Sequence, residues 1–421
     1  MVFSLFATRK NAYFCTFLVM EKKRILIANK FYYPRGGDCI VAMNLERLLK
    51  EQGHEVAVFA MHYPENVDSG WNNYYPSQVD FSSSLINKLK AARRLMGWGD
   101  IKASFNKILD DFRPDIVHLH NIHSYLSPVL AKLAKQRGCR VLWTLHDYKL
   151  VCPSYACLLN EKPCEKCIGR GKMLVLKNRC MKGSFAASAM AYIEALKWNR
   201  NVLDRYADAF ICPSNFMASK MRKDGFDSEK IHGVCNHIEP EKQQLFDSLN
   251  VEREDYYAYV GRLSQEKGIE TLLNVASQLP YILKVAGDGP LFAQLKQQYS
   301  GSSNIEFCGR LDARQIAELL SKARFSVMPS ECYDNNPLGV IESLCAGTPV
   351  VGARIGGIPE LLNDANGIAF SSGSKEELSK AISKAFEIQW NNESIKESSS
   401  HLFSPQVHLD KILYLYGRND E

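Results

Sequence analysis

Short apolar segments alternate with longer amphipathic ones along most of the chain. Residues 24–29 form the first apolar run, and a glycine-bearing loop leads from it to an amphipathic stretch from about Asp38 to Gln52. Such runs between turn residues predict buried strands, and the 3.6-residue period predicts helices. Further strands are expected at residues 56–60, 115–120, 141–145 and 209–213. This order predicts a parallel sheet with helices on both faces.

A second series of the same kind follows Asn236. Its expected strands lie at residues 256–260, 281–286, 305–308, 325–328 and 348–352, with a helix from about Gly268. The polar stretch 239–254 is the best linker candidate. We therefore expect two doubly wound domains, over residues 20–238 and 239–400, and a helix within 401–421 that packs back on the first domain.

Composition supports a globular chain of two domains. Of 421 residues, 46% are hydrophobic and 23% are charged, which argues against disorder. The net charge of +6 is small and is not gathered into one run, so nucleic acid is not an expected partner. Thirteen cysteines, mostly single within apolar segments, favour a reducing compartment.

The first residues have a different character. Arg9 and Lys10 split the apolar stretches there, so neither a spanning helix nor a signal sequence is predicted, and no later apolar run has membrane-spanning length. Met20 would be a natural start, and we expect residues 1–19 to lie outside the fold. A cytoplasmic protein is expected, with the inner face of the cytoplasmic membrane as a candidate location.

Several loops after predicted strands suit an anionic ligand. Gly36 and Gly37 would let backbone N–H groups approach an anion, although a structural turn is the commoner use of such a pair. Arg262 and Lys267, in Gly261-Arg262-Leu263-Ser264-Gln265-Glu266-Lys267-Gly268, suit a diphosphate. The alternative is a solvated turn in which Lys267 pairs with its acidic neighbour.

Two acids flank a turn into another predicted helix. Asp334 and Glu342 lie eight positions apart in the stretch 329–342. Leu338 and Gly339 fall at the expected helix N-terminus, which can hold a phosphate, while the two carboxylates accept hydrogen bonds from hydroxyls.

These motifs together resemble the retaining family-four glycosyltransferases of GT-B fold. The resemblance runs in order from about residue 24 to 370 and includes Ala286-Gly287-Asp288-Gly289-Pro290, Gly347-Thr348-Pro349-Val350-Val351 and Gly356-Gly357-Ile358-Pro359-Glu360. It implies two Rossmann-like domains facing across a cleft. It also implies a hexosyltransferase-type enzyme (EC 2.4) that moves a sugar from a nucleotide diphosphate donor, such as a UDP- or GDP-sugar, to a saccharide or lipid-linked acceptor in cell-surface polysaccharide synthesis. Retention at the anomeric carbon and no obligatory divalent metal are further implications.

The resemblance also implies roles for individual residues. Arg262 and Lys267 would neutralise the diphosphate, Glu342 would bind the ribose, and Asp334 would meet the transferred sugar. His146 would lie near that sugar, although without the resemblance a structural histidine is the more ordinary interpretation. The resemblance also places in the donor-binding set the residues of two loops and of the helix starts that follow them. These are Gly36, Gly37, Asn335, Asn336, Leu338 and Gly339.

The chain departs from the family pattern in two places. Asp334 stands where the family usually has glutamate, and Glu331 is a candidate substitute. Cys235-Asn236-His237-Ile238 replaces the usual Asn-Gly, which puts the interdomain turn in question.

Asp147 is a candidate acid or base, with an exposed structural aspartate as the alternative.

A cysteine cluster lies in an expected insertion over residues 152–180. Four of its five thiolates can bind a structural zinc ion, while free thiols or a redox pair are the alternatives. The members are Cys152, Cys157, Cys164, Cys167 and Cys180.

The acceptor is expected on the first domain. Residues 86–107 interleave basic and apolar side chains, so they can lie on an anionic membrane as a peripheral contact. An ordinary solvated helix is the favoured alternative. The residues concerned are Lys88, Lys90, Arg93, Arg94, Lys102 and Lys107, with Leu85, Leu89, Leu95, Met96 and Trp98.

Two other functions compete with transfer. A nucleotide-sugar epimerase of the same fold would share the diphosphate cleft, and a degenerate subunit would bind the donor without turnover. Turnover with an acceptor distinguishes these alternatives, because fold alone does not determine function.

Overall fold

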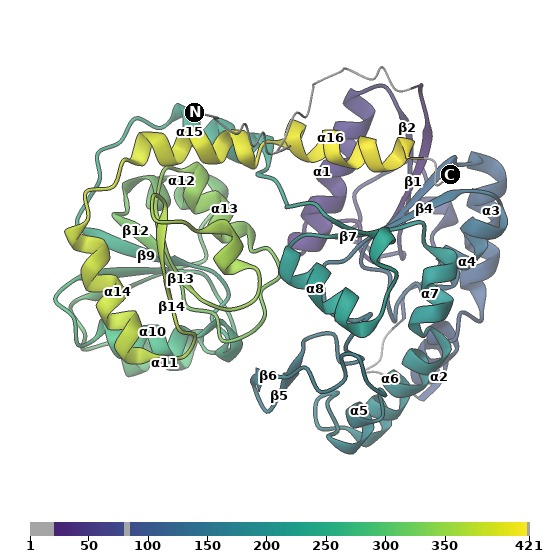
Figure 1. The fold of residues 1–421 in the computed structure, drawn as a ribbon, viewed down its shortest axis with the longest axis horizontal. Helices are drawn as coiled ribbons and strands as arrows, with labels where there is room; N and C mark the ends of the chain where they lie inside the picture. The colour runs from purple at the N-terminus through teal and green to yellow at the C-terminus, as the bar shows by residue number, and fades with distance from the viewer. Residues whose placement is uncertain (1–20, 80–84, 419–421) are drawn as a thin grey trace, which may run out of the picture.

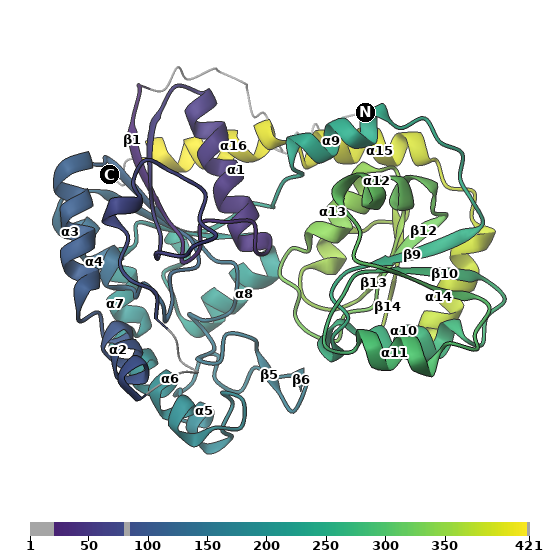
Figure 2. The same cartoon turned by 180° about the vertical axis from the view of Figure 1, so that it is seen from behind.

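The computed structural model describes residues 21–79 and 85–418, which form two units side by side (Figures 1 and 2). Each unit has a six-stranded parallel sheet between helices. The prediction of two doubly wound domains is confirmed. The expectation for residues 1–19 lies outside the described residues.

The first sheet has the strand order β2-β1-β3-β4-β7-β8. Its central strands are buried on both faces because helices cover each side. Helices α1 and α16 pack on one face, and α3, α4, α7 and α8 pack on the other. The strands are β1 (Arg24–Ala28), β2 (Glu55–Phe59), β3 (Ile116–Leu119), β4 (Arg140–Thr144), β7 (Ala209–Cys212) and β8 (Ile231–Gly233).

The helices of this unit come in two groups. Those that cover the sheet are α1 (Gly37–Glu51), α3 (Asp100–Phe112), α4 (Val129–Gln136), α7 (Arg200–Tyr206) and α8 (Asn215–Asp224). The peripheral elements are η1 (Asn72–Tyr74), α2 (Leu85–Leu95), β5 (Leu158–Leu159), β6 (Lys162–Pro163), α5 (Leu174–Lys177), α6 (Phe185–Lys197) and η2 (Ser228–Lys230).

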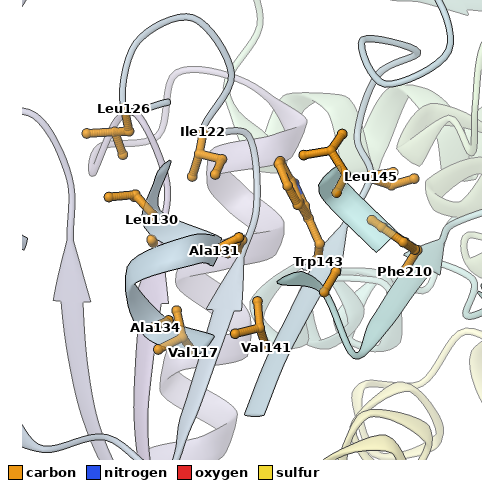
Figure 3. Packing of buried hydrophobic residues seen from close by; sticks show 14 of the residues in the cluster. Val117, Ile122, Leu126, Leu130, Ala131, Ala134, Val141, Trp143, Leu145 and Phe210 are labelled. Atoms are coloured by element: carbon orange, nitrogen blue, oxygen red, sulfur yellow. The ribbon is translucent and has the colours of Figure 1, made fainter. Parts of the chain in front are cut away.

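Trp143 is the largest fully buried side chain of the first unit's core. It lies among Ile122, Leu145 and Phe210, while the small side chains of α4 approach the sheet at Val117 and Val141 (Figure 3). Large and small side chains thus interlock beneath the loops that follow β3 and β4. This packing holds those loops in place.

The second sheet has the order β11-β10-β9-β12-β13-β14. Its strands are β9 (Tyr256–Val260), β10 (Ile282–Ala286), β11 (Ile305–Gly309), β12 (Phe325–Met328), β13 (Val350–Ala353) and β14 (Gly367–Phe370). One face is covered by α10 (Ile269–Ala276), α11 (Phe292–Gln298) and α14 (Lys375–Glu387). The other is covered by α9 (Pro240–Ser248), α12 (Ala313–Lys322), α13 (Leu338–Cys345) and α15 (Asn392–Leu402), and two short turns, η3 (Gln265–Lys267) and η4 (Ile358–Leu361), lie at the loops.

The polar stretch 239–254 is not an extended linker. Residues Pro240–Ser248 form α9, which packs against α12 and α13 of the second unit. Proline at the first turn of α9 suits a helix start. The chain therefore crosses between the units before α9.

The last helix, α16 (Pro405–Gly417), returns to the first unit, as Figure 1 shows. Leu409, Ile412 and Leu415 pack into the same cluster as α1, and the hydroxyl of Tyr416 lies 2.7 Å from His118 Nδ1. At the crossing, the Ile238 N–H donates to the Phe403 carbonyl at 2.9 Å. The two crossing segments are therefore hydrogen-bonded to each other.

Candidate active site

The N-termini of α1 and α13 meet where the two units face one another. A Cβ atom on Gly37 would lie 3.5 Å from Leu338 Cδ1. Neither helix has a side chain that caps its N-terminus. Two sets of unpaired N–H groups with partial positive charge therefore point into one space, which suits an anion.

Arg262 and Lys267 lie on the loop after β9, beside this space. The Arg262 guanidinium is exposed, and within the described residues it has no hydrogen bond or ion pair. The Lys267 ammonium pairs with the Asp334 carboxylate, which also accepts from the Ser330 hydroxyl. Burial acts to lower the pKa of Lys267, but Asp334 outweighs it and the pKa is raised. Lys267 therefore stays charged.

The loop carrying Lys267 closes tightly against the loop after β12. Gly268 has φ +68°, and any side chain there would overlap the Pro329 carbonyl. Glu331 accepts from the Thr271 hydroxyl at 2.6 Å and does not pair with Lys267. Asp334, rather than Glu331, thus lies beside the cation.

Glu342 is held by a different lysine. Its Oε1 accepts from Lys242 Nζ at 2.6 Å, and Lys242 also bonds Glu239 at 2.7 Å. Burial raises the pKa of Glu342 even though Lys242 acts to lower it. Lys242 lies on α9, within the stretch that was expected to be a linker. That stretch therefore supplies the ion-pair partner of Glu342.

Asn335 and Asn336 join the two units in this structure. Asn335 accepts from the Ser214 hydroxyl at 2.6 Å and donates to the Leu145 carbonyl at 3.0 Å. Asn336 accepts from the Asn236 N–H at 3.0 Å. Both amides are therefore engaged in contacts between the units.

Glu360 supplies a second contact of this kind. Its two carboxylate oxygens accept from the N–H groups of Asn215 and Phe216, at 2.7 and 2.5 Å, at the start of α8. A carboxylate at a helix N-terminus satisfies unpaired donors and the helix dipole. The Gly356 to Glu360 motif thus lies at the boundary between the units.

His146 follows β4 and lies beside other buried histidines. Its Nε2 is 2.9 Å from His120 Nδ1, and the two rings stack with centroids 5.2 Å apart. His120 Nε2 has no hydrogen-bond partner among the described residues. Burial lowers the pKa of His146, and it lowers the pKa of His118 to about 3. These rings are therefore neutral near pH 7.

Two carboxylates flank His146. Asp38, on the first turn of α1, accepts from Asn121 at 2.9 Å and lies 3.9 Å from Lys30 Nζ. Burial acts to raise the pKa of Asp38, but the charge of Lys30 and the hydrogen bond from Asn121 act against it and the pKa is lowered. Burial raises the pKa of Asp147 despite Lys30. Asp38 is thus the more firmly ionised of the two.

Two family models match consecutive parts of the chain. The model described as Glycosyl transferases group 1 matches residues 241–401, and Glycosyltransferase Family 4 matches residues 35–242. The chain belongs to the group 1 glycosyltransferases. It is therefore a glycosyltransferase enzyme (EC 2.4), as the resemblance implied.

Relatives and solved structures agree with this family. An uncharacterized 42.6 kDa protein in the cps region of Klebsiella pneumoniae is 27% identical over 353 residues, which are 80% of this chain and 87% of the relative. The lipopolysaccharide outer core galactosyltransferase WaaB is 16% identical with a TM-score of 0.63, covering 93% of this chain and 98% of WaaB. Anabaena HepE in complex with UDP-glucose has 16% identity, a TM-score of 0.60 and the same coverage. These structures establish the GT-B fold.

Sequence reasoning missed several residues of this glycosyltransferase site. Lys30, Asp38 and Lys242 pair with predicted residues or lie beside them, but only the fold brings them close. The histidines near the end of β3 could have been found from the sequence, because His118, His120 and His123 fall within six positions at the end of an apolar run. Such a density at a strand end marks a candidate site.

A cavity of about 390 Å³ opens in the first unit of the glycosyltransferase. His123, Lys149, Arg170 and Trp198 are among its lining residues. His123 Nε2 lies 3.8 Å from Asp147 Oδ1. The cavity therefore adjoins the loops that carry Asp147 and His146.

The predicted basic segment 86–107 of the glycosyltransferase divides into α2 and α3. Arg94 is not part of a basic surface: it is 1% exposed and its guanidinium pairs with Asp100 at 2.5 Å. The turn between the helices brings Asp100 back to it. Leu89 and Trp98 are 60% and 51% exposed, whereas the side chain of Leu85 lies outside the described residues.

Among the described residues of this glycosyltransferase, no helix is both long and apolar enough to cross a membrane. In the same residues, no three histidine, cysteine, aspartate or glutamate side chains form a ready cluster for a metal ion.

Proposed function

We propose that this glycosyltransferase transfers a sugar, with retention, from a UDP- or GDP-sugar to a saccharide or lipid-linked saccharide. The observation that carries the proposal is the pair of uncapped helix N-termini at Gly37 and Leu338, with Arg262 and Lys267 beside them. UDP-glucose in the similarly folded HepE supports the donor class.

The diphosphate would lie between the two helix ends. Negative charge grows on the leaving group as the bond to the anomeric carbon weakens, and fixed cations and N–H dipoles stabilise that charge. Arg262 can bind two phosphate oxygens at once, and Lys267 supplies a point charge. Because these groups fill the role of a cation, we expect no obligatory divalent metal.

Donor binding would rearrange the acids. When Lys267 turns to phosphate, Asp334 is released to accept a hydrogen bond from a sugar hydroxyl. Glu342, oriented by Lys242, would accept from the ribose. Neutral His146, positioned by His120, would contact the sugar from the first unit.

The cavity of the first unit is the proposed acceptor side. Trp198 lines it, and Arg170 offers a cation for a phosphorylated or lipid-linked saccharide, whereas the lining Lys149 is paired with Glu194 at 2.9 Å. Similarity to WaaB and to a protein of the Klebsiella pneumoniae cps region supports a role in surface polysaccharide synthesis.

A lipid-linked acceptor would require the chain to reach a membrane. The ends of α2 and α6 lie together, because the Trp198 indole donates to the Leu95 carbonyl at 2.8 Å and Lys197 lies over the Trp98 ring at 4.9 Å. These two helices and the turn after α2 carry four exposed apolar side chains: Leu89, Trp98, Ile193 and Leu196. We define these four residues as the apolar face and propose that it contacts anionic lipid at the cytoplasmic side.

A turnover assay tests the proposed transfer. Purified protein is incubated with a panel of nucleotide sugars and candidate saccharide acceptors, with and without EDTA, and nucleotide diphosphate release is measured. We expect release from one donor that survives EDTA and falls about a hundredfold or more in Arg262→Ala, Lys267→Ala and Glu342→Ala. Arg314→Ala, an exposed control, should retain full activity.

The products separate the alternatives. A glycosylated acceptor with the donor's anomeric configuration supports the proposal. A free nucleotide sugar with an inverted ring carbon would instead identify an epimerase, and donor binding without any product would identify a subunit that has lost turnover.

A further inference from the structure

The cysteine-bearing segment has very little regular structure of its own. Between β4 and α6 it contains only the two-residue strands β5 and β6 and the four-residue helix α5. Six of the nine non-glycine residues with positive φ in the described chain lie here: Tyr155, Cys157, Asn160, Glu161, Arg179 and Lys182. Such backbone persists only where surrounding structure holds it. The segment is therefore held by tertiary contacts, such as the Lys172–Asp224 ion pair, rather than by regular secondary structure.

Four of the five cysteines line one small cavity. It has a volume of about 10 Å³, and its polar lining residues are Cys152, Cys164, Cys167 and Cys180 together with Ser154, Lys166 and Asn178. This volume matches a single small particle such as a water molecule or an ion. Leu158, Ile168 and Val175 close it from the sides.

Cys157 is not among the lining residues. It is fully buried, and its thiol is hydrogen-bonded to Cys152. The hydroxyl of Ser154 lies 3.2 Å from the Cys152 sulfur. The Cys157 thiol and the Ser154 hydroxyl therefore both lie against the Cys152 sulfur.

The charges around the cavity suit an anionic metal complex. Residues 161–182 contain seven lysines and arginines but two glutamates. A zinc ion bound by four thiolates carries a net charge of about −2. The surplus of basic side chains would balance that charge.

We propose that Cys152, Cys164, Cys167 and Cys180 bind one structural zinc ion, with Cys157 supporting the site by its hydrogen bond to Cys152. Cys164 and Cys167 have the Cys-x-x-Cys spacing of a zinc-binding turn. The four sulfurs do not yet converge on one point. Zinc binding draws these side chains toward the shared cavity and fixes the segment around it.

The zinc-binding turn also carries a contact between the units. Glu165 lies between Cys164 and Cys167, and its Oε1 accepts from the Tyr333 hydroxyl at 3.1 Å. Tyr333 directly precedes Asp334. The metal site therefore orients the side chain that holds the acid-bearing loop of the second unit, whatever sugar that loop binds.

Metal analysis of the full chain tests the proposal. Protein purified under reducing conditions and equilibrated with zinc should retain about one zinc ion per chain after dialysis. Cys164→Ser and Cys180→Ser should fall below about 0.1 per chain, whereas the buried control Cys212→Ser, outside the site, should stay near one. Retention near zero in the wild type, or an equal loss in Cys212→Ser and Cys164→Ser, would overturn the assignment.

Cobalt substitution gives a readout that does not depend on the variants folding. Apo protein titrated with Co²⁺ should develop an intense thiolate-to-cobalt charge-transfer band together with the visible bands of a tetrahedral site, saturating at about one equivalent. A titration with no such bands would overturn the proposal even if the serine variants are insoluble.

Discussion

Gly37 and Leu338 define, at the scale of single residues, the space assigned to the diphosphate. Gly37→Val would place methyl groups between the two helix ends, where a Cβ alone already reaches 3.5 Å from Leu338. We expect the affinity for a nucleotide diphosphate to fall about tenfold or more, which corresponds to about 1.4 kcal/mol. Calorimetric titration measures it.

The control for this substitution is Gly301→Ala. Gly301 has open space around its Cβ position and lies on the second unit away from the boundary. An affinity for Gly37→Val equal to that of the control would contradict the placement of the diphosphate.

His408 gives a pH dependence that can be assigned to one group. Its Nδ1 lies 2.8 Å from the Cys235 carbonyl, and burial lowers its pKa to about 3 from an ordinary 6.5. The unfolded chain therefore binds a proton below pH 6.5 that the folded chain excludes, so the stabilisation is complete above pH 6.5 and declines toward pH 3. Within that window, each unit by which the pH falls lowers the free energy of unfolding by about 1.4 kcal/mol.

Urea unfolding at pH 7 and pH 5 measures this contribution. The free energy of unfolding of the wild type should drop between these values by about 2 kcal/mol more than that of His408→Asn, which retains a donor but does not titrate. Equal drops would show that His408 is not the group responsible.

Individual site residues differ in how well the sequence predicted them. Arg262, Lys267 and Asp334 could be predicted because they lie in motifs of fixed spacing, and the structure brings Lys267 and Asp334 together. Lys242, by contrast, reaches Glu342 only through the packing of α9, and Arg94 is buried by an ion pair formed across a turn. Neither contact has a local sequence signal, and whether these residues act in catalysis stays a prediction.

At the scale of elements, α16 is attached to the first sheet by apolar packing, by the hydrogen bond from Arg140 Nε to the Leu415 carbonyl, and by the buried contact of Tyr416 with His118. Tyr416→Phe removes the partner of His118 Nδ1 without changing the packing of the ring. Leaving that buried nitrogen unpaired should lower the free energy of unfolding by about 1–3 kcal/mol. Chemical denaturation measures the effect, and Tyr414→Phe is the matched control because Tyr414 is 66% exposed. An unchanged Tyr416→Phe protein would contradict the contact.

The ends of α2 and α6 form the apolar face proposed to meet a membrane. Trp98→Ala combined with Leu196→Ala should lower binding to vesicles containing anionic lipid by about tenfold or more, since each buried apolar side chain contributes about 1.5–3 kcal/mol. Vesicle co-sedimentation measures it. Ile282→Ala, which alters an exposed apolar residue of the second unit, should bind like the wild type. Vesicle binding that is absent, or unchanged in the double variant, would refute the contact.

Elements were predictable where periodicity was strong. The apolar runs gave the central strands of both sheets nearly to the residue, because strands buried on both faces must be continuously apolar. The edge strands β8 and β14 were missed, since they are short and each contains glycine. Helix α9 was mistaken for a linker because only Phe246 of its residues is buried.

At the scale of the whole molecule, the two units are joined by two chain crossings and by contacts at the boundary. The carboxylate of Glu360 at the start of α8 and the amide of Asn335 against Leu145 both connect the units. We expect the units to change their separation about the hydrogen-bonded crossings at Ile238 and Phe403. Closure around the donor would then exclude water from the reacting centre.

The central claim is that a nucleotide diphosphate binds between the two units against Arg262 and Lys267. Its most direct measurement is isothermal titration of the full chain with UDP and with GDP, repeated on Arg262→Ala, Lys267→Ala and the control Arg314→Ala. We predict binding of one nucleotide at about one per chain, weakened tenfold or more, or about 1.4 kcal/mol, by each of the first two substitutions and unaffected by the third. Binding of neither nucleotide, or equal affinity in all four proteins, would contradict this account of the site.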